Sequence, residues 1–174
     1  MKKLSLTTLI LSSSIAGSAM AGESLSKDTI QKAQENWAEA IVEIGQAKLD
    51  GKDYESVAKM KVSELYDFDD GTVLFKPTKA AEDQFRNSYD EAISYFVGGI
   101  VSEDKGFALQ PWTNVRFENE DIAIKDDYAV AMGNYYFTDT SGKEVKVEYT
   151  FGYTLEDDGS VKIDLHHSSL PYQP

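Results

Sequence analysis

Residues 128–138, YAVAMGNYYFT, begin the most regular part of the sequence, and VKVEYTFGYTL at 145–155 and VKIDLHHSS at 161–169 continue it. Aromatic and β-branched side chains alternate with small or polar ones through these segments, as they do in strands that bury one face. The turn residues Ser141-Gly142 and Asp157-Asp158-Gly159 separate the segments at hairpin spacing. The second half of the chain therefore predicts an antiparallel meander. Two shorter strands are expected just upstream, at 115–117 and 122–124, on either side of a polar turn at 118–121.

The residues before Pro111 follow a helical period instead. Helices are expected at 28–45, at about 53–66, and at 79–96, where Thr78 is a suitable N-cap and Gly98-Gly99 a stop. The expected apolar faces of the first and third helices consist of Ile30, Ala33, Trp37, Ile41 and Ile44, and of Ala81, Phe85, Tyr89, Ala92 and Phe96. Helices followed by a meander predict an α+β fold, with a curved antiparallel sheet wrapped over N-terminal helices as a cone-shaped, cystatin-like roll. Such a roll leaves a pocket between its concave face and the helices.

The first 21 residues have the pattern of a secretory signal peptide. Lys2 and Lys3 precede a short apolar stretch, and Ala19-Met20-Ala21 matches a small-x-small cleavage site. The mature chain is then expected to be one α+β domain, 22–174, exported to the bacterial periplasm.

Charge and composition exclude several classes of function. The formal net charge of −13 becomes −15 when Lys2 and Lys3 are removed, so binding to nucleic acid or an anionic membrane through bulk electrostatics is not expected. The chain has no Cys, so it has no disulfide, thiol nucleophile or thiolate metal site. The sequence also lacks a Gly-rich phosphate loop, a nucleophile elbow and an HExxH motif.

The only two histidines, His166 and His167, are adjacent in the last expected strand. Side chains alternate across a strand, so His167 and Ser169 should share the apolar face that begins with Val161, while His166 and Ser168 should point away. Adjacent strand residues diverge and do not chelate one ion, and two histidines are fewer than the three ligands common in catalytic zinc sites. We therefore expect no metal and no other cofactor.

Most of the remaining polar and aromatic candidates have a structural interpretation as well. Thr78 is suited to capping a helix, whose free N–H groups also attract anions, and Tyr95 is suited to packing with a bonded hydroxyl. Arg86 fits either a carboxylate partner or an anionic ligand. The alternating aromatics of the strands are expected to be mainly core residues: Tyr135, Phe137, Tyr149, Phe151 and Tyr153.

Five blocks in this order resemble the iota-class carbonic anhydrases: VLFKPT at 73–78, SYFVGG at 94–99, PWT at 111–113, AMGNY at 131–135 and LHHSSLPY at 165–172. That family is similar to the association domain of calmodulin-dependent kinase II and to the wider nuclear-transport-factor-2-like, or SnoaL-like, fold. The resemblance spans about residues 37–172 and implies reversible hydration of carbon dioxide to bicarbonate, with members described as working without metal.

The resemblance also implies a pocket made by a Thr, a Tyr, a His and a Ser. By motif these are Thr78, Tyr95, His167 and Ser169, and strand alternation favours this pair over His166 and Ser168. The expected mechanism uses the hydroxyls to orient a water and bind the substrate, and His167 to accept or relay the proton. Arg86 is a further candidate for binding the anionic product.

Two other functions fit the same fold, because fold does not determine function. One is a non-catalytic module that binds a small ligand or builds an oligomer, and the other is a dehydratase or isomerase. Pocket hydroxyls that converge on a volume of a few atoms would favour the anhydrase over a binding module. A homodimer is expected, since an open sheet has an outer face to cover.

Overall fold

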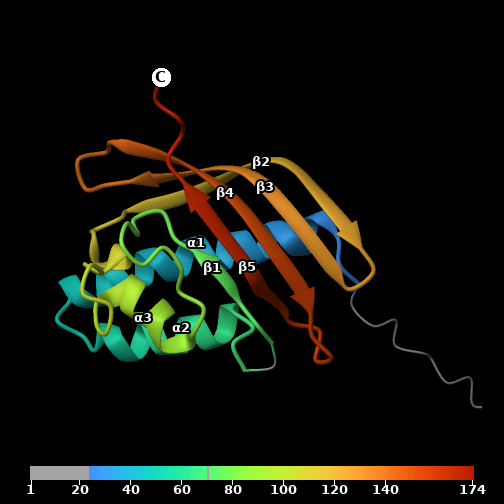
Figure 1. The fold of residues 1–174 in the computed structure, drawn as a ribbon, viewed down its shortest axis with the longest axis horizontal. Helices are drawn as coiled ribbons and strands as arrows, with labels where there is room; N and C mark the ends of the chain where they lie inside the picture. Colours follow the sequence, from blue (N-terminus) through green and yellow to red (C-terminus); the bar gives the residue numbers. More distant parts are fainter. Residues whose placement is uncertain (1–23, 70) are drawn as a thin grey trace, which may run out of the picture.

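The computed structural model describes residues 24–69 and 71–174, so the expected signal peptide lies outside the described residues. Helices α1 (Lys27–Leu49) and α2 (Tyr54–Leu65) come first, followed by strand β1 (Leu74–Lys76), helix α3 (Tyr89–Val97) and the short 3₁₀ helix η1 (Phe107–Leu109). Four long strands complete the chain: β2 (Asn114–Lys125), β3 (Tyr128–Thr138), β4 (Glu144–Leu155) and β5 (Val161–Ser169) (Figure 1). The expected α+β class is confirmed.

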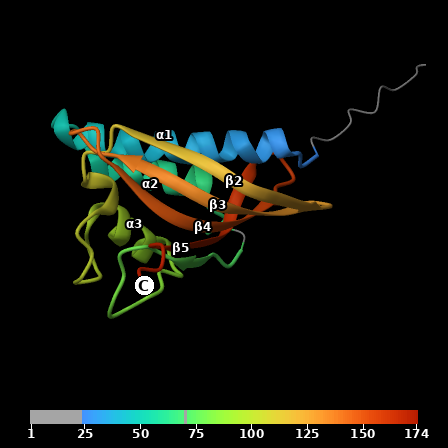
Figure 2. The ribbon, with the colours of Figure 1, turned by 90° about the horizontal axis from the view of Figure 1, so that it is seen from above.

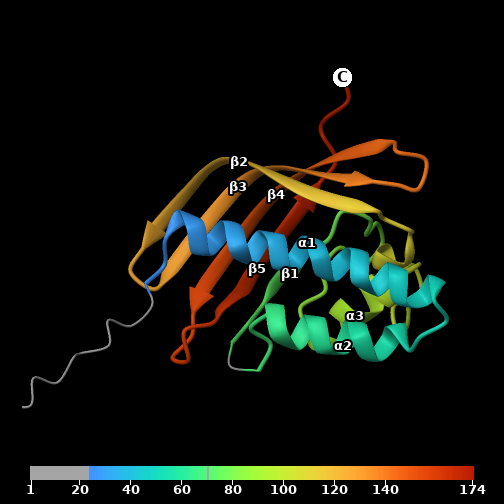
Figure 3. The same cartoon turned by 180° about the vertical axis from the view of Figure 1, so that it is seen from behind.

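The five strands form one curved sheet in the order β1-β5-β4-β3-β2. The strands β2 to β5 are antiparallel neighbours, as expected for a meander, whereas β1 pairs with β5 in parallel. Helix α1 lies across one face of the sheet, as the view from behind shows (Figure 3). Seen from above, α1 lies directly along the sheet with α2 beside it, and α3 lies at one end of the sheet (Figure 2).

The interior between α1 and the sheet is mainly aromatic. Trp37, on the buried face of α1, contacts the rings of Phe117, Tyr135 and Phe151 at centroid distances of 5.7–5.9 Å. Edge and tilted contacts of this kind are favoured by the ring quadrupoles. The alternating aromatics therefore form the core as expected, and they surround the polar groups described below.

One expected strand pair is a single strand. Residues 118–121, expected to be a turn, continue β2 and carry a bulge between Asn119 and Asp121. A bulge absorbs an extra residue without ending the strand. These polar residues lie at the exposed edge of a bent strand, and their composition resembles that of a turn, which explains the expectation.

The third helix is ten residues shorter at its start than expected. It begins at Tyr89, and Ser88 is its N-cap, in a capping box with Glu91. The Ser-x-x-Glu signal at 88–91 was present in the sequence, and the longer apolar period at 79–96 obscured it. Thr78 is therefore not a helix cap, and Phe85, expected on the buried face, is 54% exposed.

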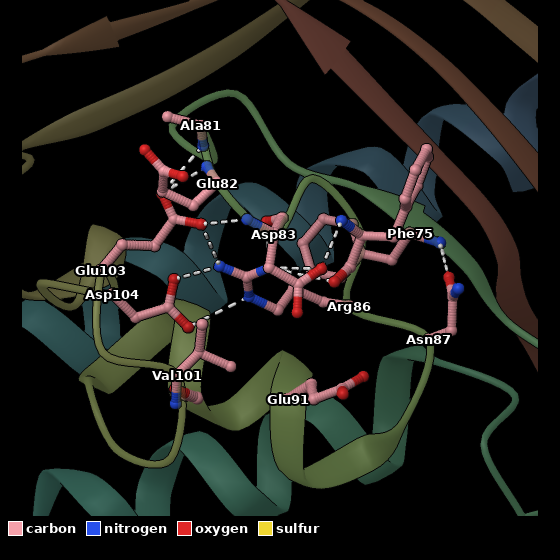
Figure 4. Close-up of polar contacts among 12 residues, drawn as sticks. Phe75, Ala81, Glu82, Asp83, Arg86, Asn87, Glu91, Val101, Glu103 and Asp104 are labelled. Atoms are coloured by element: carbon pink, nitrogen blue, oxygen red, sulfur yellow. Dashed lines mark hydrogen bonds and ion pairs between the residues drawn. The ribbon is translucent and has the colours of Figure 1, made fainter.

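Residues 79–88 form a loop held by one carboxylate. The Glu103 side chain accepts the backbone N–H groups of Ala81, Glu82 and Asp83 at 2.8–3.2 Å (Figure 4). These hydrogen bonds lower the pKa of Glu103 to about 2. Because Glu103 follows α3 in the chain, this contact fixes the loop that follows Thr78 against the end of the helix that carries Tyr95.

Among residues 24–69 and 71–174, no helix is long and apolar enough to span a bilayer.

Candidate active site

The structure places the histidine pair opposite to the expected orientation. His166 is 2% exposed and Ser168 is 2% exposed, whereas His167 is exposed and Ser169 only partly buried. The alternation argument that placed His167 and Ser169 in the pocket was wrong about orientation. Its assumption failed because β5 is not regular: Gly152 pairs with Leu165 and the next residue, Tyr153, pairs with Ile163. Asp164 is thus an extra residue, and it reverses the alternation beyond it.

The imidazole of His166 lies inside an aromatic cage. Its ring is 4.1 Å from Phe151 and 4.4 Å from Phe75 between centroids, and it is stacked on Tyr66. Burial in these apolar surroundings lowers the pKa of His166 well below its ordinary value, and the nearby His167 lowers it further. His166 is therefore neutral near pH 7.

Hydrogen bonds determine which nitrogen of His166 carries the proton. Trp37 Nε1, which can only donate, donates to the Tyr66 hydroxyl at 2.8 Å, and that hydroxyl lies 2.8 Å from His166 Nδ1. The Tyr66 O–H has Nδ1 as its acceptor, so Nδ1 carries no hydrogen. The proton of the neutral ring is on Nε2, which lies 3.1 Å from Ser168 Oγ and 3.5 Å from the Tyr135 hydroxyl.

The hydroxyls of Thr78, Tyr95 and Tyr135 meet beside this pair. Thr78 lies close enough to both tyrosine hydroxyls, and Ser168 close enough to that of Tyr135, to oppose the rise in their pKa values. The Tyr95 hydroxyl also accepts the backbone N–H of Lys79, at 3.4 Å. Burial raises the pKa of Tyr95 and Tyr135 above the ordinary value of a phenol, so both remain protonated donors. The expected residues Thr78 and Tyr95 thus lie together, with Ser168 and His166 in place of their neighbours.

Thr78 also lines an open pocket of about 400 Å³ between the loop after β1, η1 and the strands β3 and β4. The wall is largely apolar and aromatic, with Phe107, Trp112 and Phe137, and Lys79 and Lys143 lie beside it. A larger hollow of about 630 Å³ between α1 and the start of β2 contains none of the hydroxyl cluster. Thr78 therefore connects the 400 Å³ pocket with the buried cluster.

Arg86 does not face this pocket. Its side chain is fully buried, and it forms a paired contact with Asp104, from Nε at 3.1 Å and Nη2 at 2.7 Å. The remaining N–H groups donate to the carbonyls of Asp83 and Phe85 and to Glu103 (Figure 4). All five donors are in use, so the expectation that Arg86 binds substrate finds no free N–H here. The residue instead anchors the 79–88 loop.

Two residues of the cluster, Tyr66 and Tyr135, were not singled out from the sequence. Tyr135 was expected to be core, and it is core, but its hydroxyl is turned toward Ser168 and Thr78. Tyr66 ends the expected second helix, and no pattern marks it as a partner of a histidine 100 residues away. The one available signal is general: a buried tyrosine hydroxyl needs a hydrogen-bond partner.

No group of three or more His, Cys, Asp or Glu side chains suited to a metal ion occurs within the part of the chain that the structure describes. The cluster's own donors are neutral hydroxyls and one imidazole whose two nitrogens are both bonded.

The sequence of this chain is similar to those of known proteins. The model of the metal-independent carbonic anhydrase family matches residues 28–170. The chain is 38% identical over 154 residues to a metal-independent carbonic anhydrase of Nostoc sp. strain PCC 7120, covering 85% of this chain and 75% of the relative.

Solved structures are also similar to this chain in fold and sequence. A cyanobacterial iota-carbonic anhydrase complexed with bicarbonate has a TM-score of 0.84 and 34% identity, over 97% of this chain and 100% of that chain. A Xanthomonas campestris structure described as a calcium/calmodulin dependent protein kinase II association domain has a TM-score of 0.56 and 25% identity, over 83% and 87%. Further matches with nuclear transport factor 2-like proteins, at lower identity, show the fold alone. With its family model matched over residues 28–170, this chain belongs to the metal-independent carbonic anhydrase family.

Proposed function

We propose that this protein catalyses the reversible hydration of carbon dioxide to bicarbonate at the floor of the 400 Å³ pocket. The observation that carries the proposal is the convergence of four hydroxyls, those of Thr78, Tyr95, Tyr135 and Ser168, on one small volume beside a neutral histidine. Convergence of this kind favours a small polar substrate over a large apolar ligand. The bicarbonate bound to the cyanobacterial relative supports the same substrate.

Each group has a role that follows from its chemistry. Carbon dioxide is apolar, so it fits the aromatic wall around Phe107 and Phe137. As water adds to the carbon, negative charge develops on the carbon dioxide oxygens, and pre-placed O–H donors stabilise that charge. Tyr95, Tyr135 and Ser168 supply such donors, and Thr78 both holds the tyrosine hydroxyls and faces the pocket.

His166 acts through Ser168 rather than as a base. Nε2, the nitrogen beside Ser168, already carries the ring proton, and the lone pair of Nδ1 accepts the hydrogen bond from Tyr66, so the ring has no free lone pair beside the hydroxyl cluster. Burial also disfavours the charged ring. Ser168 accepts the Nε2–H bond, so its own O–H is directed away from His166. His166 therefore acts as a positioning residue. It is not the proton acceptor that the sequence led us to expect of the histidine in this site.

The proton released by the reaction goes to solvent. Carbon dioxide and water give bicarbonate and one proton, and the open pocket provides the path to bulk water and buffer. Lys79 and Lys143 outnumber the one carboxylate, Asp139, among the described residues that line this pocket, in a chain of net charge −13. A local positive charge offsets the repulsion that an acidic protein exerts on an anionic product.

The first test is stopped-flow hydration of carbon dioxide by the chain from Gly22, before and after exhaustive chelation. We expect activity that survives chelation and is unchanged by added zinc. Activity that is lost on chelation and restored by one metal would overturn the metal-free mechanism. A folded protein without activity in both samples would overturn the proposed function.

We also propose a homodimer in the periplasm. No helix of residues 24–69 and 71–174 covers strands β2 to β5 on the face seen in Figure 1. In β3, the exposed Met132 lies on the side opposite to the buried Ala131. Burial of such a face is a common reason for self-association. Light scattering that gives a monomer mass at micromolar concentration would contradict the dimer. The export proposal rests on residues 1–21 and predicts a mature N-terminus at Gly22 in a periplasmic fraction.

A further inference from the structure

The orientation of His166 and Ser168 depends on one extra residue in β5. Ile163 and His166 are three positions apart, so a regular strand would turn them to opposite faces. In the structure both are buried, at 1% and 2% exposure. Asp164 has no partner of its own in the ladder with β4, and this extra residue reverses the alternation of buried and exposed side chains.

Space for this bulge exists because residue 152 is glycine. A Cβ at Gly152 would lie 2.5 Å from Asp164 Oδ1, 2.5 Å from the Tyr128 hydroxyl and 2.9 Å from Leu165 Cβ. Three atoms from two neighbouring strands thus fill the position of the missing side chain. Any larger residue at 152 would have to displace the Asp164 carboxyl and the Tyr128 hydroxyl, and would press on Leu165 Cβ, which is attached directly to the backbone of β5.

Tyr128 reaches the region of the bulge from β3, across β4. It is the first residue of β3 and pairs with Thr154, so its side chain crosses β4 to reach Asp164 in β5. Burial raises the pKa of Asp164, and the nearby Tyr128 hydroxyl opposes that rise. Within the described part of the chain, Asp164 Oδ1 itself is buried without a hydrogen-bond partner. The Tyr128 hydroxyl thus packs over Gly152 beside the Asp164 carboxyl, so that a side chain of β3 reaches the bulge in β5 across β4.

The same strand position is attached to α2 from the inner side. Tyr66 forms an isolated parallel bridge with Ile163, and the Asp67 N–H donates to the Ile163 carbonyl at 3.1 Å. Tyr66 is also the residue whose hydroxyl donates to His166 Nδ1. The bulge and the histidine therefore share one anchor, and a shift of β5 would break both contacts.

We propose that Gly152, Tyr128 and Asp164 are positioning residues for the reaction: they hold the bulge that turns His166 and Ser168, rather than His167 and Ser169, toward the buried hydroxyl cluster. The proposal rests on the proposed function only in taking the inward pair as the reactive one.

The test uses Gly152→Ala in the chain from Gly22 without a histidine tag, so that only two imidazoles contribute to a ¹⁵N NMR spectrum. In the parent protein the buried His166 ring should stay neutral from pH 5 to 8. In Gly152→Ala we expect loss of this non-titrating ring and a fall of about 100-fold in kcat/KM for carbon dioxide, the usual size of a lost transition-state donor. A variant that keeps both the non-titrating ring and full activity would overturn the proposal.

A rescue separates positioning from general damage. Deleting Asp164 in the Gly152→Ala background leaves residue 152 paired with Leu165 and Tyr153 with Ile163, which is now a regular ladder. Ile163 and His166 are then two positions apart and share the inner face without a bulge. We expect the non-titrating ring to return and kcat/KM to recover to within about tenfold of the parent. A folded double variant in which neither signal returns would overturn the proposal.

If Gly152→Ala does not fold, Tyr128→Phe tests the positioning role instead. It removes one hydroxyl and leaves the ring, and Tyr136→Phe, whose hydroxyl binds exposed Glu118, is the matched control. We expect Tyr128→Phe to lower kcat several-fold with little change in KM and to broaden the His166 signals, whereas Tyr136→Phe should change neither. Equal behaviour of the two variants would overturn the proposal. A parent that shows the NMR signature but no hydration activity would refute the proposed function and leave the positioning intact.

Discussion

Replacing Ser168 with alanine should lower kcat/KM for carbon dioxide hydration by about 10²–10³-fold, the cost of losing one donor aimed at developing negative charge. Ser168 Oγ is 3.1 Å from His166 Nε2 and lies beside the Tyr135 hydroxyl, so groups on two sides orient it. The change removes one oxygen from a buried site, and the fold should persist. Stopped-flow rates with a pH indicator measure the effect, and circular dichroism checks the fold.

Ser169→Ala is the matched control for Ser168→Ala. Ser169 is the adjacent residue of the same strand, and its hydroxyl donates to Glu148 on the exposed side at 3.1 Å. We expect this variant to keep kcat/KM within about twofold of the parent, as for most surface substitutions. The reverse result, with Ser169→Ala inactive and Ser168→Ala active, would show that the outer pair carries the reaction.

Replacing His166 with glutamine should reduce both activity and stability. The Tyr66 hydroxyl and Ser168 each lose their imidazole partner, and a buried polar group left unpaired costs about 1–3 kcal/mol. We expect kcat/KM to fall by about 10²-fold, because Ser168 is no longer oriented. Urea unfolding at pH 7.5 and stopped-flow rates measure the two effects. His167→Gln, on the exposed face, is the control and should leave both nearly unchanged.

The same pair of variants predicts a pH dependence of stability. The pKa of His166 is well below its ordinary value in the folded protein and close to 6.5 in the unfolded chain. Below pH 6.5 the unfolded chain therefore binds a proton that the folded protein does not, and the free energy of unfolding falls with pH. Between pH 7.5 and 5.5 the parent should lose about 1 kcal/mol through this group. His166→Gln should lack that component and His167→Gln should retain it; the opposite assignment would contradict a buried, neutral His166.

Local patterns in the sequence were sufficient for the fold class and for part of the site. The alternation in 128–138 and 145–155 predicted β3 and β4 closely, because each strand buries one continuous face against α1 and each hairpin is local. Thr78 and Tyr95 were identified through the family's motifs, and the structure brings their hydroxyls together. The start of α3 was misplaced because an apolar period extends through residues 79–88, which Glu103 and Arg86 hold as a loop.

The sequence by itself thus determined the class of fold, the family and which short segment of β5 contains the histidine and serine of the candidate site. Only the tertiary structure decided which of the two adjacent pairs faces the buried hydroxyl cluster. That choice depends on Asp164 bulging into the space above Gly152, with Tyr128 against it and Tyr66 beyond it. These residues are far apart in sequence and meet only when β3, β4, β5 and α2 are assembled. The alternation of residues within one strand does not reveal a bulge that depends on the neighbouring strands. For this reason the alternation argument assigned the wrong residues to the buried face.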